Sequence, residues 1–351
     1  MLATLLLTAP AAAQLQITPP ATTPSAPAEK PKPKPHTITK KKEAAPAPKP
    51  SASPKPSPLP QPAATVIPAP PNDDPNVDLV FGAYQRGQYK TAFELATGRA
   101  QAGDPKAMTM LGELYSNAMG IRRDYAKAAE WYKRAADAGD REAMFALAML
   151  RISGRGGPVD KNEAVKLMAS AAKLGEPKAA YNLALLYLDG QTLPQDVRRS
   201  AELLRQAADA GLPEAQYALA TFYKEGTGVP KDPERAVRLL QAASLADNVD
   251  AEVEYAIAMF NGTGTPKNQP AAVALLRKAS RQGNAIAQNR LAWVLINGVG
   301  TPMDKVEGFK WHLVAKTGGK GDPELDKQFS ELPAEDRAKA EAAARKWLGT
   351  K

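Results

Sequence analysis

The sequence predicts an all-α fold, a right-handed α-solenoid of about seven helix-turn-helix repeats of 36 residues, preceded by a proline-rich tract. The main observation is a register of small residues that recurs every 36 positions without insertion or deletion. The alanine column has no exception and consists of Ala107, Ala143, Ala179, Ala215, Ala251 and Ala287. The first glycine column has one exception, an aspartate: Gly103, Gly139, Gly175, Gly211, Asp247, Gly283 and Gly319. The second glycine column has one exception, a threonine: Gly120, Gly156, Thr192, Gly228, Gly264 and Gly300. The second observation is that the segments between the glycines have the period of amphipathic helices.

The fourth unit illustrates how two helices follow one another. The first keeps its apolar and small side chains, within residues 200–208, on one arc and ends near Gly211, which suits a left-handed closing turn. The second is predicted over residues 213–225, before the glycine-rich turn in EGTGVPKD. Asp232 and Pro233 then form an N-cap and first-turn proline that favour a new helix. Because one pair cannot bury its whole apolar arc, we expect each pair to stack on the next.

The folded domain is predicted to span residues 75–351, with a capping helix at each end. Asp74 and the sequence PNVDLVFGAYQR indicate a helix over residues 75–86. The sequence PAEDRAKAEAAARKWL, residues 333–348, is rich in strong helix formers, and we expect Trp347 to anchor it.

Residues 1–13 indicate a secretory signal peptide, because the apolar run of residues 2–7 precedes Ala11, Ala12 and Ala13. No Lys or Arg precedes the run, and the alternative is a mildly apolar, frayed terminus. The run is too short for a membrane span, so we expect no transmembrane segment. The signal predicts a periplasmic or secreted protein.

Residues 14–74 form a linker with 18 prolines, eight lysines, four acidic residues and no aromatic residue. Such a segment cannot offset its ordering entropy, so we expect it to be disordered and to act as an extended spacer. The alternative is a basic arm that makes weak contact with the cell wall or another anionic surface.

Composition excludes several kinds of chemistry. The chain has no cysteine and two histidines, which rules out disulfides and cysteine-ligated metals. The net charge is +9, but residues 75–351 carry 38 basic against 33 acidic side chains. This balance is too even for a polyanion-binding stripe, so we expect no nucleic acid partner.

The sequence predicts neither an active site nor a cofactor. His312 shares its repeat position with Leu204 and Leu240, so we expect it in the core. Trp131 and Trp311 share a leucine-rich position and are also expected in the core. The carboxylates show no pattern that singles out an acid-base pair, and we expect no enzyme.

Partner binding is predicted on the polar side of the first helix of each pair. Stacking aligns equivalent residues there, and one such row supplies the candidate partner-binding residues: Lys133, Arg205, Gln241 and Arg277. If this face is concave, its basic side chains could engage an acidic peptide or domain. The alternative is an ordinary solvated face.

The runs AAEWYKRAADAGDREAMFALAMLRISGRGGPVD and SAELLRQAADAGLPEAQYALATFYKEGTGVPKD resemble Sel1-like repeats, which are related to tetratricopeptide repeats. The resemblance extends over about residues 88–319, and the fifth unit departs from it at Asp247, Asn248 and Tyr255. It implies a binding solenoid without catalytic residues, of a kind common in exported bacterial proteins. Some members are periplasmic regulators of a sensor kinase.

We therefore expect a non-enzymatic protein-protein interaction scaffold or signalling regulator in the bacterial envelope. Its partner would be a protein or peptide, such as an envelope sensor or assembly protein. One alternative is a structural envelope protein associated with the cell wall through its basic proline-rich arm. A third hypothesis, a peptidoglycan hydrolase, would need a mechanism that uses carboxylates alone.

Overall fold

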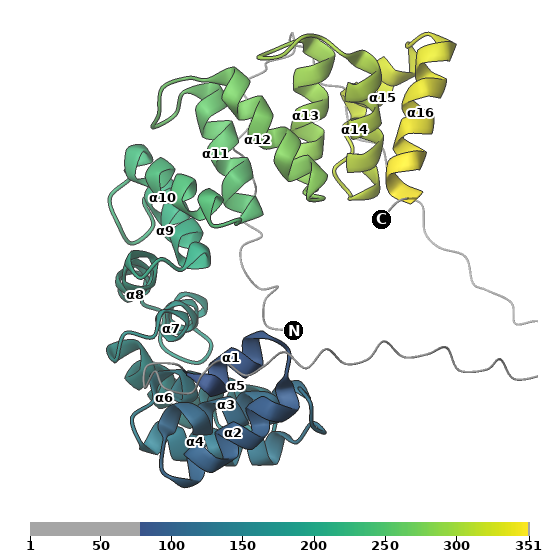
Figure 1. Cartoon of the computed structure of the whole chain (residues 1–351). Coiled ribbons are helices and arrows are strands. Elements are labelled where there is room, and N and C mark those ends of the chain that lie inside the picture. Colours follow the sequence, from purple (N-terminus) through teal and green to yellow (C-terminus); the bar gives the residue numbers. More distant parts are fainter. Residues whose placement is uncertain (1–77, 350–351) are drawn as a thin grey trace, which may run out of the picture. The chain divides into compact units, whose positions relative to one another are not determined.

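The computed structural model describes residues 78–349, which form sixteen α-helices and no strand (Figure 1). The helices follow one another in chain order: α1 (Leu79–Gln85), α2 (Tyr89–Gln101), α3 (Pro105–Asn117), α4 (Tyr125–Asp137), α5 (Arg141–Ser153), α6 (Lys161–Lys173), α7 (Pro177–Asp189), α8 (Val197–Asp209), α9 (Pro213–Glu225), α10 (Pro233–Leu245), α11 (Val249–Asn261), α12 (Gln269–Arg281), α13 (Ala285–Asn297), α14 (Lys305–Thr317), α15 (Pro323–Ser330) and α16 (Ala334–Gly349). This confirms the all-α prediction. The predicted signal peptide, residues 1–13, and linker, residues 14–74, lie outside the described residues.

Most of the described helices begin at a side-chain N-cap, and several end at a left-handed glycine. The Oδ1 atom of Asp232 accepts a hydrogen bond from the backbone N–H of Arg235 at 2.8 Å, which starts α10. Helix α9 covers the predicted residues 213–225 and ends at Gly226, whose φ is 80°. Helix α8 ends at Asp209, and Gly211, with φ 87°, closes its turn.

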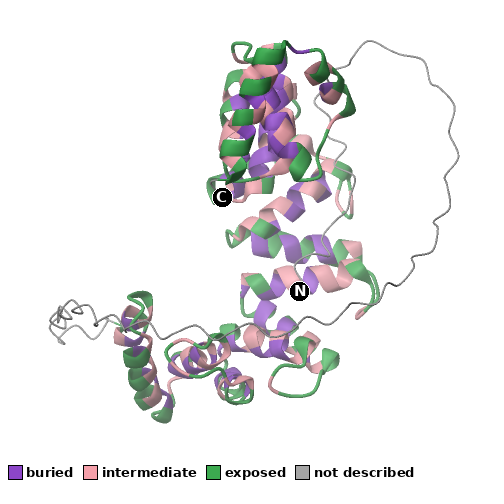
Figure 2. Cartoon of the chain, turned by 90° about the vertical axis from the view of Figure 1, so that its right-hand side faces the viewer, coloured by how far each residue is buried: buried purple, intermediate pink, exposed green. Residues whose placement is uncertain are grey.

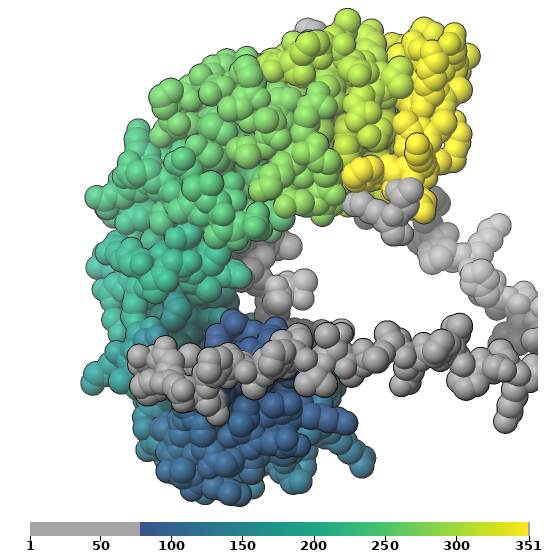
Figure 3. Space-filling model, viewed as in Figure 1, coloured from purple at the N-terminus to yellow at the C-terminus, as the bar shows by residue number. Residues whose placement is uncertain are grey.

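Consecutive helices pack against one another along the chain, as expected of an α-solenoid. From α3 to α13, each odd-numbered helix packs most closely on the even-numbered helix that follows it across the glycine-rich turn. Residues of the alanine column are at most 3% exposed, which allows the helix backbones to approach closely. Buried residues line the helix faces that meet (Figure 2), and the surface of each unit continues directly into that of the next (Figure 3).

The second glycine column is required where the turn of one unit closes over a helix of the preceding unit. Gly228 has φ 66°, and a Cβ atom there would lie 2.7 Å from the carbonyl oxygen of Val197, the first residue of α8. Gly156 and Gly264 face the first residues of α4 and α10 in the same way. Thr192, the exception in this column, does not have a positive φ. The turn between α7 and α8 therefore follows a different path.

Each end of the array is covered by a further helix, α1 or α16. Helix α1 lies within the predicted range of residues 75–86 and begins at Leu79, because the Asp78 carboxylate caps the N–H groups of Val80 and Phe81 at 3.1 and 3.2 Å. At the other end, α16 packs on α14. Trp347 meets Trp311 edge to face, with ring centroids 5.1 Å apart, as expected of an anchor.

The fifth unit holds a strained backbone position. Asp247 replaces the glycine of the first column, yet it keeps the left-handed conformation, with φ 59°. Its side chain is 81% exposed, and its Oδ1 lies 3.4 Å from the ammonium of Lys278. A side chain in this region is disfavoured, whereas glycine adopts it freely.

Replacing Asp247 with glycine is expected to raise the free energy of unfolding by about 0.5–1 kcal/mol. Relief of the backbone outweighs the loss of an exposed ion pair, which contributes little. Chemical denaturation monitored by circular dichroism would measure the change. Asp247→Asn serves as the control, because it removes the charge and retains a side chain that tolerates the left-handed region. A glycine variant less stable than the asparagine variant would contradict this account.

Candidate functional site

The described residues contain neither a metal site nor a membrane-spanning helix. Between residues 78 and 349, no three His, Asp or Glu side chains are grouped so that they could hold a metal ion. Every helix in the same range is too short or too polar to cross a membrane.

The histidine and tryptophan predictions hold with one difference. His312 is fully buried, and its Nε2 lies 2.9 Å from Oδ1 of Asp326, which confirms the expected core position. Trp311 is 3% exposed and also belongs to the core. Trp131 is only half-buried, and the Arg134 guanidinium lies over its ring, 4.6 Å from the centroid. This tryptophan therefore keeps one face toward a charged side chain.

The predicted partner-binding residues lie at equivalent positions of α4, α8, α10 and α12: Lys133, Arg205, Gln241 and Arg277. Lys133 is exposed and pairs with Asp137 on its own helix at 2.8 Å. Arg205 is exposed and donates a hydrogen bond from Nη2 to the Tyr223 hydroxyl at 3.1 Å. The row thus lies on the even-numbered helices, and Lys133 and Arg205 have different local partners.

A second surface, the odd-helix face, lies on the other set of helices. It consists of half-buried side chains at the fifth or ninth residue of an odd-numbered helix: Phe145, Met149, Tyr181, Tyr217 and Trp293. Each packs against a core cluster and leaves part of its surface open to solvent. This face was not predicted from the sequence. A signal was present, because the fifth-residue position holds Thr109 in α3 and Asn289 in α13, which is unusual for a fully buried position.

Carboxylates lie near both tyrosines of the odd-helix face. Burial raises the pKa of Tyr181 to about 12, and the Glu214 carboxylate adds to this shift. Burial also raises the pKa of Tyr217 to about 12, with smaller contributions from Glu254, Asp250 and Glu225. The phenols therefore stay neutral and can donate hydrogen bonds at any physiological pH.

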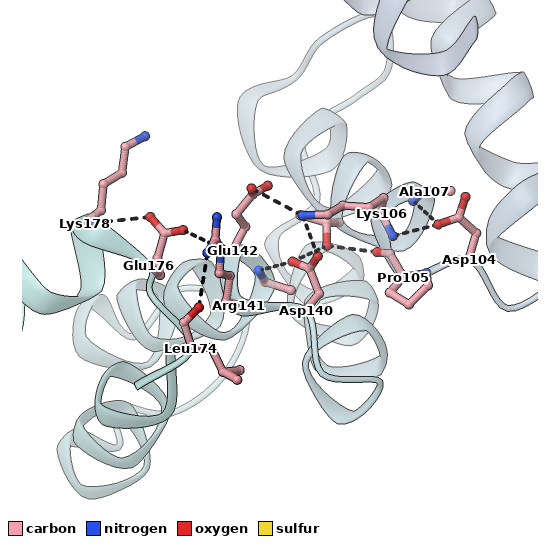
Figure 4. A network of polar contacts seen from close by, with 12 residues as sticks. Asp104, Pro105, Lys106, Ala107, Asp140, Arg141, Glu142, Leu174, Glu176 and Lys178 are labelled. Atoms are coloured by element: carbon pink, nitrogen blue, oxygen red, sulfur yellow. Dashed lines mark hydrogen bonds and ion pairs between the residues drawn. The ribbon is translucent and has the colours of Figure 1, made fainter. Parts of the chain in front are cut away.

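Polar contacts link the N-terminal ends of successive odd-numbered helices (Figure 4). The Lys106 ammonium on α3 lies 2.9 Å from an oxygen of Asp140 and 3.3 Å from one of Glu142. Asp140 is almost buried and also caps α5 through the N–H of Ala143 at 2.8 Å. The network continues from Arg141 to the carbonyl of Leu174 at 3.1 Å. These carboxylates bind neighbouring units together, which accounts for them without acid-base chemistry.

A hollow of about 260 Å³ lies among α9, α10 and α11. Its lining is mainly apolar and includes Leu240 and Ile257, together with the ion pair of Lys224 and Glu254, whose charged atoms lie 3.1 Å apart. The volume is below the roughly 300–1,000 Å³ of most small-molecule pockets.

Comparison with known proteins agrees with this architecture. The family model for the Sel1 repeat matches six consecutive segments, which together make up more than half of the chain: residues 105–140, 141–176, 177–212, 213–248, 249–284 and 285–319. Each segment begins at an odd-numbered helix and includes the even-numbered helix on which it packs. A search of curated protein sequences finds no match.

Solved structures show the same repeat fold. A Sel1 repeat protein from Oxalobacter formigenes is 27% identical over 68% of this chain and 98% of its own, with a TM-score of 0.61. The protein c5321, a protective antigen of uropathogenic Escherichia coli strains, is 23% identical over 76% of this chain and 67% of its own, with a TM-score of 0.52. The second likeness concerns the fold alone.

Proposed function

Because the chain belongs to the Sel1 repeat family, we propose that it is a non-enzymatic scaffold or signalling regulator of the bacterial envelope that binds a partner protein through its odd-helix face. Sel1 and tetratricopeptide-like repeats typically mediate protein-protein interaction, and Sel1 repeats are generally not catalytic. The observation that carries the proposal is the row of half-buried aromatic and apolar side chains on three successive odd-numbered helices, α5, α7 and α9.

This row has the properties of a protein-binding surface. Aromatic side chains that are already held by the core on one side lose little conformational freedom when a partner covers the other side. Tyr181 and Tyr217 add hydroxyl groups that can fix the orientation of a partner. Export to the envelope is supported by the apolar run and alanine triplet of residues 1–13, and the lysines of residues 14–74 suit an extended arm.

Site-specific crosslinking would test the proposed surface. A photoreactive phenylalanine analogue at Tyr217 or Phe145 is expected to capture the same protein from an envelope extract. The analogue at Lys346, an exposed residue of α16, is the control and should not capture it. Adding Tyr181→Ala should weaken capture at Tyr217 by about tenfold, the effect of removing one aromatic anchor. Equal capture at all three positions, or none at Tyr217 and Phe145, would overturn the proposal.

A further inference from the structure

Two arginines on different helices donate to one tyrosine hydroxyl. Nη2 of Arg205, on α8, lies 3.1 Å from the Tyr223 oxygen, and Nη1 of Arg235, on α10, lies 3.4 Å from it. Tyr223 is only 5% exposed, whereas both arginines are exposed. The buried phenol thus holds two guanidinium groups close together at the surface, where their remaining N–H groups can meet a ligand.

The charge at this position is not balanced within the described chain. The Nε atom of Arg235 pairs with Asp232 at 3.1 Å. Arg205 forms no ion pair with a carboxylate of residues 78–349; Glu202, on the same helix, pairs with Arg199 at 2.7 Å. Arg205, Arg235 and Asp232 together therefore carry one net positive charge, which a single additional carboxylate would neutralise. Burial raises the pKa of Tyr223, but the hydrogen bonds from Arg235 and Arg205 outweigh burial and lower it below its ordinary value.

The repeat supplies an internal comparison, because equivalent positions recur every 36 residues. Tyr187 is the equivalent of Tyr223 in the preceding unit, and its flanking positions hold Ala169 and Arg199. Arg151 occupies the position one unit earlier and is neutralised by Glu163 at 2.6 Å. An arginine on each side of a tyrosine occurs in one unit only, at Tyr223. The arrangement is therefore not a requirement of the fold.

The surrounding helices favour an acidic partner. Helices α8, α10 and α12 together carry eight basic and three acidic residues, whereas α7, α9 and α11 carry two basic and six acidic residues. The even-numbered helices of these units thus present an excess of positive charge, which attracts an acidic segment and orients it.

We propose that Arg205 and Arg235, held together by Tyr223, bind the side-chain carboxylate of an aspartate or glutamate in an acidic segment of a partner protein. A carboxylate fits the planar fork of a guanidinium through two parallel hydrogen bonds. Asp232 already contacts one edge of the Arg235 guanidinium, with its Oδ2 atom 3.1 Å from Nε. The inference rests on the proposed function, since the ligand belongs to a protein partner, but it uses the even-numbered helices and not the odd-helix face.

Binding of a fluorescein-labelled peptide rich in glutamate and aspartate, followed by fluorescence anisotropy, would test this inference. Arg205→Gln is expected to weaken binding about tenfold. Arg281→Gln, at an exposed arginine of α12, removes the same charge and should weaken binding by about twofold or less. Equal losses in the two variants would show attraction without a defined site and would overturn the inference, as would a wild-type protein that does not bind the peptide.

A pair of tyrosine variants separates geometry from charge. Tyr223→Phe leaves the net charge unchanged but removes the oxygen that holds both arginines, so the peptide should bind about threefold more weakly. Tyr187→Phe makes the same change in the neighbouring unit and should leave binding unaltered. Equal behaviour of the two variants would contradict the positioning role of Tyr223. Matched unfolding midpoints would exclude a general loss of structure.

Two further experiments identify the ligand and separate this inference from the proposed function. A peptide with phosphoserine in place of the acidic residues should bind no more tightly than the acidic peptide. Much tighter binding would show that the ligand of the two arginines is a phosphate group and not a carboxylate, and would overturn the inference. Arg205→Gln protein carrying the photoreactive residue at Tyr217 should still capture some partner. If capture at Tyr217 persists but the acidic peptide binds Arg205→Gln and Arg281→Gln proteins equally well, only the inference about Arg205 and Arg235 fails. If capture fails in the wild-type background, the proposed function fails.

Discussion

Replacing Gly228 with alanine is expected to lower the free energy of unfolding by about 2–5 kcal/mol. Two costs add at this position. The backbone has φ 66°, which disfavours any side chain, and the new Cβ would lie 2.7 Å from the carbonyl oxygen of Val197. That oxygen belongs to the first turn of α8, so the turn after α9 must move away from the preceding unit. Urea unfolding monitored by circular dichroism would measure the loss.

Gly211 provides the matched control. It has φ 87°, but a Cβ atom there would meet no other atom within 4 Å. Gly211→Ala should therefore show the backbone cost alone, about 1 kcal/mol. The difference between the two variants measures the close approach between units. Equal destabilisation would mean that the second glycine column serves only the turn conformation and not the contact between repeats.

Deletion of residues 330–351 is expected to destabilise the last repeat by at least about 3 kcal/mol and to cause aggregation. The deletion removes α16, whose buried Ala340 and Ala344 face the core, together with Trp347. It uncovers Trp311, which is 3% exposed in the intact protein and contacts the Trp347 ring. Thermal unfolding and light scattering would follow the two effects.

Point variants distinguish the anchor from the rest of the helix. Trp347→Ala should reproduce a large part of the loss, because Trp347 packs against the last core cluster and its ring meets Trp311. Lys346→Ala, at an exposed position of α16, should have little effect. A truncated protein that stays monomeric with an unchanged unfolding midpoint would show that α16 does not act as a cap.

The fold was predictable from the sequence because the same helix-capping and close-packing residues recur in several repeats. Asp232 as an N-cap, Gly226 as a left-handed terminus and Ala215 at a close contact recur at fixed intervals, and each confirms the helix boundaries found elsewhere. Which helices pack most closely together was harder to predict from the sequence. The sequence grouped α8 with α9, whereas α9 packs most closely on α10, across the turn that contains Gly228. The 36-residue period gives the spacing of the units, but it does not show whether a helix packs more closely on the preceding or on the following helix.

The candidate sites were predictable only in part, for the same reason. Arg205 was found because its row is polar, but its contact with Tyr223 joins residues of different helices and cannot be read from one helix. The Tyr181 and Tyr217 side chains were missed because aromatic residues at regular spacing resemble core positions. Their half-exposure in three dimensions identifies them as surface residues, in line with the polar Thr109 and Asn289 at the same repeat position.

Nearly all of the packing joins helices that are consecutive in the chain. Each helix therefore finds its main partner within a few tens of residues, and the entropy of closing a long loop is never incurred. Structure can grow from one end to the other as successive pairs become available, without waiting for the distant terminus. The same locality makes length an adjustable property: one more block of 36 residues would extend the surface of the array while leaving every existing interface but one as it is.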